Sequence, residues 1–328
     1  PGGLPVFALV GRYGTASDDT EHAARTAQAF IASAGDVDAF TRALASELRS
    51  WFFSAPPAIG WGTMKALLRL AVGVGPGSSG VRSAGNGPCM RAPVLGALVP
   101  DDVPKLMALV DASSRLTHVD IRAIEGARLL ALWAALTVRC QDRPTWDEFV
   151  VAVESAGALR PDSPFRSHLD DIGRSLGMDE PTSRWAKAAW GMQGVSGFVG
   201  HTVPAVLHLL HQRPRTTRVH EWEASVRIAV ALGGDTDTVA GLVGALTALV
   251  PGTHVPASWS AYFRDWPCSL DWLREVGAKA SEVAENGTRA RPIPIPGGFL
   301  ALSVRNTAFL AVVLASGIHR ALRTAAEW

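Results

Sequence analysis

The chain has 328 residues, of which 48% are hydrophobic and 19% are charged, and its formal net charge is +1. This composition supplies enough apolar side chains for a large buried core, in one domain or two. The balanced charge excludes a global electrostatic preference for nucleic acid or for a membrane surface. Cys89, Cys140 and Cys268 are scattered without zinc or redox spacing, so we expect reduced thiols in a cytoplasmic protein.

Apolar residues at helical spacing, interrupted by glycine and proline, predict that most of the chain is helical. One helix is expected to begin at Asp18-Asp19 and to stop at Gly35, and another to begin at Asp237-Thr238 and to stop before Pro251. Between them the pattern predicts further helices over 36–51, 64–72, 123–138, 145–157, 185–190, 202–210 and 221–232.

The C-terminal part of the sequence combines a proline run with an apolar stretch. Residues 292–296 read PIPIP, which predicts a short extended connector on the surface. The stretch 299–318 contains Arg305 and Asn306, which favours a buried helix over a membrane span. Because the helices that begin at the two Asp pairs must pack together, we expect one all-α domain over residues 1–328.

Two short acidic segments lie near opposite ends of the chain: Ser17-Asp18-Asp19-Thr20, and Asp235-Thr236-Asp237-Thr238 after Gly233-Gly234. Carboxylates that meet in a fold repel one another unless a cation neutralises them, and hard divalent cations take oxygen ligands. The alternative is that each segment only caps its helix, which Asp, Ser and Thr do in any protein. Either segment alone favours the cap, but both together favour a site for two metal ions.

A glycine-asparagine loop over residues 83–91 is the third signal. Gly85 and Gly87 allow backbone N–H groups to approach a ligand oxygen, and Asn86 can both donate and accept hydrogen bonds, as sugar hydroxyls require. Arg91 could meet a phosphate or a carboxylate. A tight loop that leads into a helix explains the same residues equally well.

Two weaker segments complete the set of candidates. His118 lies two residues before Asp120, and a lone histidine is more often structural than catalytic. Ser196-Gly197-Phe198 forms a small-residue loop before a helix, where Phe198 could stack on a base or fill the core. The basic stretch 211–220 is expected to be a solvated loop, although a protein or nucleic acid that carries the substrate could dock there.

Four segments in this order resemble the ADP-ribosylglycohydrolase family. Residues 17–20 (SDDT) match its S/T-D-D-T pattern, and residues 233–238 (GGDTDT) match its G-G-D-T/C-D-T pattern. Residues 85–91 (GNGPCMR) are similar to G-N-G-x-x-M-R, and Thr117-His118 is similar to an S/T-H segment. The resemblance covers about residues 15–250, and the C-terminal connector and helix look like those of bacterial members.

The resemblance implies a compact orthogonal multi-helix bundle with a central cleft for two Mg²⁺ ions, or Mn²⁺. The metal positions are Ser17, Asp18, Asp19, Asp235, Asp237 and Thr238. Asp18 and Asp19 are the catalytic candidates, with Asp19 preferred as the base. The substrate-binding positions are Ser83, Gly85, Asn86, Gly87, Met90, His118, Ser196, Gly197 and Phe198.

The implied activity is Mg²⁺-dependent hydrolysis of the glycosidic bond between ADP-ribose and a modified macromolecule, most simply a protein side chain, by a monomer. An ADP-ribosylated nucleic acid stays open as a substrate. Three alternatives also stay open: a defence or immunity enzyme that reverses a toxin's ADP-ribosylation, a non-catalytic ADP-ribose-binding or structural homologue, and a hydrolase of small nucleotide sugars.

The N-terminal segment departs from the family pattern. Family members usually begin with a G-D-A-x-G segment followed by an acidic residue that reaches the active site, whereas residues 1–14 contain no Asp or Glu. Either the native chain begins further upstream, which we expect because this sequence begins at Pro1, or the protein has lost this segment. Glu21 follows the first acidic segment and is interpreted as an exposed residue of the first helical turn, where a helix dipole favours acids.

Overall fold

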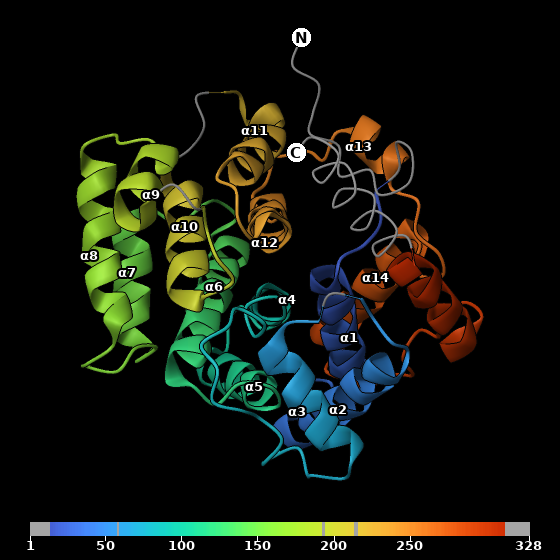
Figure 1. The fold of residues 1–328 in the computed structure, drawn as a ribbon. Helices are drawn as coiled ribbons and strands as arrows, with labels where there is room; N and C mark the ends of the chain where they lie inside the picture. Colours follow the sequence, from blue (N-terminus) through green and yellow to red (C-terminus); the bar gives the residue numbers. More distant parts are fainter. Residues whose placement is uncertain (1–13, 58, 192–193, 213–215, 312–328) are drawn as a thin grey trace, which may run out of the picture.

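A computed structural model describes residues 14–57, 59–191, 194–212 and 216–311, and within these ranges the chain is helical with only isolated β-bridges (Figure 1). The prediction of an all-α fold is therefore confirmed. A further helical run over residues 298–311 carries no label. The labelled helices are α1 (Asp18–Ser33), α2 (Val37–Phe53), α3 (Trp61–Ala71), α4 (Ala92–Leu98), α5 (Val103–Arg115), α6 (Ile121–Cys140), α7 (Trp146–Ser155), α8 (Pro164–Gly177), α9 (Thr182–Trp190), α10 (Val199–Gln212), α11 (Arg218–Ala231), α12 (Thr236–Ala248), α13 (Ala257–Tyr262) and α14 (Leu270–Asn286).

Several helices begin where the sequence supplies a capping side chain. Asp36 accepts a hydrogen bond from the Ala39 N–H at the start of α2. Thr145 and Glu148 form a capping box at the start of α7, in which each side chain satisfies a backbone N–H of the first turn. These local interactions explain why the expected helix starts lie within a few residues of the observed ones.

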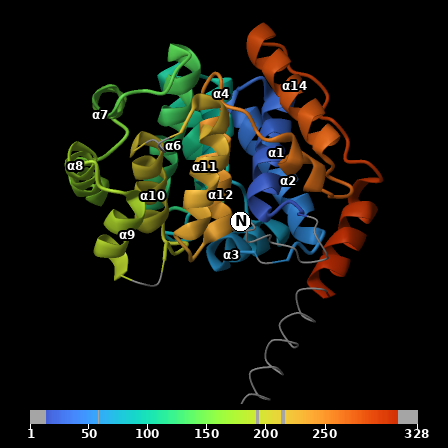
Figure 2. The same ribbon diagram turned by 90° about the horizontal axis from the view of Figure 1, so that it is seen from above.

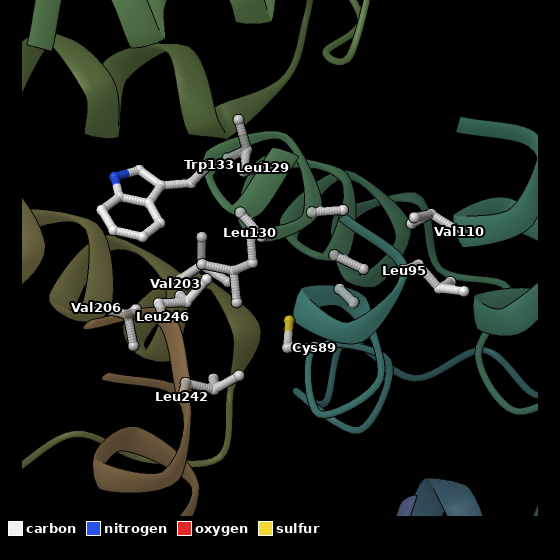
Figure 3. Close-up of a cluster of buried hydrophobic side chains, with 14 of the residues drawn as sticks. Cys89, Leu95, Val110, Leu129, Leu130, Trp133, Val203, Val206, Leu242 and Leu246 are labelled. Atoms are coloured by element: carbon white, nitrogen blue, oxygen red, sulfur yellow. The ribbon is translucent and has the colours of Figure 1, made fainter. Parts of the chain in front are cut away.

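Helix α6 forms the centre of the core. It is buried on almost every face, and α4 crosses it closely because Gly96 has no side chain: a Cβ there would lie 2.2 Å from the Ala131 carbonyl oxygen. Figure 3 shows the apolar cluster around this crossing, in which Leu95, Leu130 and Leu246 come from three different helices. Close packing of this kind fixes the positions of the helix termini, and therefore the positions of the loops that connect the helices.

The two ends of the described chain meet beside this core. Helix α1 contacts α2, α4, α12 and α14, so the helix that follows the first acidic segment lies next to the helix that follows the second. Figures 1 and 2 show α12 beside α1, with α14 on the other side of α1. The sequence predicted that the helices after the two acidic segments pack together, and the contacts between α1 and α12 confirm this.

The C-terminal part agrees with one expectation and corrects another. The connector is held at the surface, because the Gln28 side chain bonds both backbone groups of Ile293. The helix that follows is not buried as expected: Phe299 and Leu300 are 51% and 73% exposed. The apolar composition of this stretch did not reveal that only one side of the helix packs against the rest of the protein. Residues 312–318 of the predicted stretch lie outside the described ranges.

The structure also bears on the three cysteines and on membrane-spanning helices. Cys89, Cys140 and Cys268 are all free, as expected for reduced thiols. Among the described residues, none of the helices combines the length and the apolar character needed to span a bilayer.

Candidate functional site

Three carboxylates from the two acidic segments come together where α1 and α12 begin. Asp18 and Asp19 belong to the first turn of α1, and Asp237 belongs to the first turn of α12. One oxygen atom from each lies within 4.8 Å of the others. In the described structure the N-cap residues Ser17 and Asp235 make no side-chain capping bond, so capping does not explain these acidic segments.

Asp19 lies at the centre of this cluster and is 8% exposed. Its Oδ2 atom accepts hydrogen bonds from the Ser17 hydroxyl at 3.0 Å and from the Thr238 hydroxyl at 3.4 Å. Its Oδ1 atom is buried and has no hydrogen-bond partner among the described residues. A buried carboxylate oxygen without a partner is costly, and a cation would satisfy it.

The electrostatics of the cluster lead to the same conclusion. Burial, reinforced by the neighbouring Asp19 and Asp237 charges, raises the pKa of Asp18 to about 8. Burial and the charge of Asp237 raise the pKa of Asp19 to about 7. A divalent cation would reverse these shifts, because it stabilises the ionised carboxylates. The donor set of carboxylate and hydroxyl oxygens fits a hard cation such as Mg²⁺ or Mn²⁺.

Asp235 connects this cluster to the glycine-asparagine loop. The Asn86 amide nitrogen donates to Asp235 Oδ2 at 2.7 Å and to the Thr202 hydroxyl at 3.0 Å. Asn86 is itself 7% exposed, and its amide nitrogen is committed to these two protein partners. Its amide nitrogen links the loop to Asp235, and the sequence-based prediction that Asn86 contacts a sugar stays a prediction.

Three loops lie side by side through backbone hydrogen bonds. The Asn86 N–H donates to Gly197 O at 3.0 Å, which joins the 83–87 loop to the 194–198 loop. The Asp235 N–H donates to Val195 O, which joins the 194–198 loop to the second acidic segment. Gly234 is required here, since it has φ +81° and a Cβ would lie 2.1 Å from Val195 O.

His118 lies behind the glycine-asparagine loop. Its ring is buried, and Nδ1 is 2.9 Å from the Thr117 hydroxyl oxygen. Burial lowers the pKa of His118 to about 3, so the ring is neutral at physiological pH. A Cβ on Gly85 or Gly87 would come within 3.2 or 3.0 Å of the ring, so the two glycines also let the loop pack on His118.

Ser196, Gly197 and Phe198 of the 194–198 loop are exposed, whereas Val195 is buried. Phe198 is 37% exposed, and the Arg122 guanidinium lies 5.5 Å from the centre of its ring. The Ser196 hydroxyl is 2.9 Å from His201 Nδ1. Arg122 also lines a groove of about 420 Å³ together with Arg82 and Val119. Val119 directly follows His118 in the sequence. The face around Phe198 therefore offers aromatic and cationic side chains beside the acidic cluster's loops.

The remaining substrate candidates lie on the glycine-asparagine loop and on the 194–198 loop. Ser83 accepts a hydrogen bond from the Gly85 N–H at 3.3 Å, and Met90 is partly buried. Gly197 lies close to the acidic segment, because a Cβ on it would be 3.1 Å from Asp235 Oδ2. The sequence-predicted residues from four separate segments therefore meet in one region.

The family model described as ADP-ribosylglycohydrolase matches residues 1–290. The chain belongs to the ADP-ribosylglycohydrolase family. It is 26% identical to ADP-ribosylhydrolase ARH3 of Bos taurus over 198 residues, which is 55% of this chain and 54% of that protein. The chain thus spans about half the length of this curated relative.

A solved structure of an ADP-ribosylglycohydrolase-related protein complex has the same fold. Its TM-score is 0.56 at 22% sequence identity, and the match covers 83% of this chain and 82% of that one. The resemblance found from the four motifs is therefore confirmed at the level of the family and of the fold. The family is one of glycosyl hydrolases, which agrees with the enzyme class expected from the sequence.

Two sequence interpretations are wrong for this family member. Arg91 is completely buried and donates to the Thr117 hydroxyl and to the backbone and hydroxyl oxygens of Ser113, so it does not face a ligand. Glu21 is not an exposed residue of the first turn. It is 6% exposed and pairs with Arg305 at 3.0 Å, while Trp51 donates to its other oxygen.

The sequence missed some polar residues of the site. Thr202 holds Asn86, yet a single threonine in a helix carries no signal of that role. Asp265 and Arg305 contact the segment before Ser17 from the other end of the chain.

Of the basic stretch 211–220, residues 213–215 lie outside the described ranges, and Arg218 pairs with Asp142 at 2.9 Å.

Proposed function

We propose that this family member is a Mg²⁺-dependent hydrolase that cleaves the glycosidic bond between ADP-ribose and a modified protein side chain and releases ADP-ribose. One observation carries the proposal: in a chain of this family, the oxygens of Asp18, Asp19 and Asp237 lie within 4.8 Å of one another. The unpartnered buried oxygen of Asp19 adds support, because it is placed to take a cation.

Two Mg²⁺ ions, or Mn²⁺, would be held by residues of both acidic segments. Asp18, Asp19 and Asp237 form the core of the ligand set, and the proposed set also includes Ser17, Asp235 and Thr238. When bound, such ions would supply Lewis-acid chemistry, holding sugar hydroxyl oxygens and making a water molecule more acidic.

The protein's own groups suit a reaction at a ribose. Cleavage of a glycosidic bond develops positive charge on the sugar, which the carboxylates of the acidic cluster would stabilise. Asp19 is the proposed general base, since its carboxylate is buried within the acidic cluster and a bound cation would keep it ionised and able to accept a proton. Asn86 holds Asp235 in place, and the neutral His118 supports the loop that carries Gly85 and Gly87.

The rest of the substrate would lie over the loops. Ser83, Met90, Ser196 and Gly197 belong to the loops beside the acidic cluster, and exposed Phe198 offers a stacking surface for a base. We propose that Asn86 and His118 contribute by positioning the glycine-asparagine loop rather than by contacting the nucleobase of the substrate. Contacts between α1 and both α12 and α14 support the proposal that the chain acts as one domain, and we propose a cytoplasmic monomer.

The test is release of ADP-ribose from arginine-linked, serine-linked and nucleic-acid-linked substrates, with Mg²⁺ or with excess EDTA. We expect release from a protein linkage that requires Mg²⁺ and is lost in Asp237→Asn. Asp170→Asn is the matched control, because Asp170 is an exposed carboxylate on α8. Full activity of Asp237→Asn, or in EDTA, would refute the metal-dependent reaction.

The same assay separates the alternatives. Binding of ADP-ribose without release from any linkage would indicate a non-catalytic homologue. Faster turnover of free nucleotide sugars than of modified proteins would indicate a small-molecule hydrolase. Preferred release from the nucleic-acid linkage would replace protein as the substrate class, and preferential action on a toxin's modified target would indicate the defence role.

A further inference from the structure

The segment that leads into the first acidic cluster is held by the C-terminal part of the chain. The Gly14 N–H donates to Tyr262 O at 3.0 Å, and the Arg264 N–H donates to Gly14 O at 2.9 Å. These bonds form an isolated parallel bridge between Gly14 and Phe263. The backbone just before Ser17 is therefore paired with the C-terminal end of α13 and the residues that follow it.

A buried ion pair continues this contact at Ala16. The Ala16 N–H donates to Asp265 Oδ2 at 2.8 Å, and Arg305 Nη2 donates to Ala16 O at 3.0 Å. Arg305 also makes a two-bond pair with Asp265, at 3.1 and 2.6 Å. The side chains of Asp265 and Arg305 are 1% and 10% exposed. One ion pair thus satisfies both backbone polar groups of the residue that precedes Ser17.

Arg305 also holds the chain on the other side of the acidic segment. Its Nη1 atom donates to Glu21 Oε1 at 3.0 Å, and the other Glu21 oxygen accepts from Trp51. Ser17, Asp18 and Asp19 therefore lie between two anchor points, Ala16 and Glu21, that share one guanidinium group. The backbone that carries the proposed metal ligands is fixed at both ends by Arg305.

We infer that Asp265 and Arg305 are positioning residues that fix Ser17, Asp18 and Asp19 in the geometry needed to bind divalent cations. The inference rests on the proposed metal site. Metal ligands depend on the partners that orient them, and loss of such a partner typically weakens metal binding about 10- to 100-fold. Arg305 lies beyond residues 1–290, the region that the family model matches, so family membership assigns it no role.

A purely structural role would give a different result. Removing one partner of a buried ion pair destabilises a protein wherever the pair lies, because the other charge is left unpaired. A positioning role in addition predicts weaker metal binding in a protein that is still folded. Arg143 and Glu221 form another buried ion pair, which involves α11, and Arg143→Gln is therefore a matched control for the loss of stability.

The experiment measures Mg²⁺ binding by isothermal titration calorimetry on the full chain, with folding checked by circular dichroism. We expect Arg305→Gln to weaken Mg²⁺ binding at least about tenfold and Arg143→Gln to leave it unchanged. Arg305→Lys keeps a charge for Asp265 and Glu21 but lacks the two-pronged guanidinium, so we expect a severalfold loss. If Arg305→Gln does not fold, wild-type affinity in Arg305→Lys overturns the inference.

A double-mutant cycle tests the route of the effect. If Arg305 acts by orienting Ser17 and its neighbours, Arg305→Gln should weaken Mg²⁺ binding less in a Ser17→Ala background than in the wild type. Wild-type affinity in folded Arg305→Gln, or equal losses in Arg305→Gln and Arg143→Gln, would overturn the inference and leave the proposed function intact. No Mg²⁺ binding by the wild type would overturn both the inference and the metal-dependent reaction.

Discussion

Replacing Asp19 by Asn should stabilise the metal-free protein and at the same time remove its response to Mg²⁺. The pKa of the Asp19 carboxyl is raised from 3.8 to about 7, and at about 1.4 kcal/mol per pKa unit its ionisation costs at most about 4 kcal/mol of folding free energy. Asn buries a polar amide in the same place, so we expect about half of this, roughly 2 kcal/mol, to be recovered. For a chain of 328 residues, that corresponds to a rise in Tm of about 3 °C.

The pH dependence gives this prediction a sign that can be checked. An acid whose pKa is raised by folding binds its proton more tightly in the folded state, so the metal-free protein loses stability as the pH rises from about 4 through the folded pKa values of about 7 and 8. The advantage of Asp19→Asn in EDTA should therefore be small at pH 4 and full at pH 8.5. In the wild type, Mg²⁺ should raise Tm more at pH 8 than at pH 6, since it competes with the protons.

The assay is thermal unfolding followed by circular dichroism, in EDTA and in Mg²⁺, for the wild type, Asp19→Asn and the exposed control Asp170→Asn. The control should match the wild type within about 0.5 kcal/mol under all conditions. A lower Tm of Asp19→Asn in EDTA at pH 8.5, together with an undiminished Mg²⁺ response, would refute the view that repulsion and burial strain this cluster.

Three further predictions follow from the loops. Gly234→Ala should lower both Tm and Mg²⁺ affinity, because a Cβ would lie 2.1 Å from Val195 O and displace Asp235; calorimetric titration and thermal unfolding check this, and unchanged values would contradict the loop packing. Asn86→Ala should cost about 1–3 kcal/mol in chemical denaturation, since Asp235 and Thr202 lose their shared partner, and a neutral result would remove that link. The His118 ring should stay neutral between pH 5 and 8 in nitrogen-15 NMR, given its pKa of about 3, and a titration in that range would show an open, solvated ring.

The helices and the acidic segments could be predicted because their signals are local. Helical spacing and stop residues predicted a helix over 123–138, and α6 runs over Ile121–Cys140. Each of the two acidic segments alone could be a helix cap. Because a cap does not need two Asp residues, the presence of two such pairs indicated that their carboxylates meet at one site. The meeting of Asp18, Asp19 and Asp237 follows from packing of α1 on α12, which the core dictates.

The surroundings of single polar side chains could not be predicted in this way. Glu21 sits where an exposed acid is common, but Arg305 and Trp51 reach it from distant parts of the chain and bury it. Arg91 follows a glycine-rich loop, a local pattern that favours ligand binding, yet Ser113 and Thr117 take up its guanidinium. In both cases the deciding partner is far away in sequence, so no local pattern carries the information.

The acidic segments also show where a local rule fails for a functional reason. A Ser or an Asp at a helix N-cap ordinarily accepts a hydrogen bond from the first turn, as Asp36 and Thr145 do here. In the described structure Ser17 and Asp235 instead turn their side chains to Asp19 and Asn86. Both helix starts thus forgo a stabilising bond, as the Thr217 N-cap of α11 also does. The side chains of Ser17 and Asp235 are instead engaged by the acidic cluster and by the glycine-asparagine loop, and this engagement supports the proposal that the two segments serve a cation.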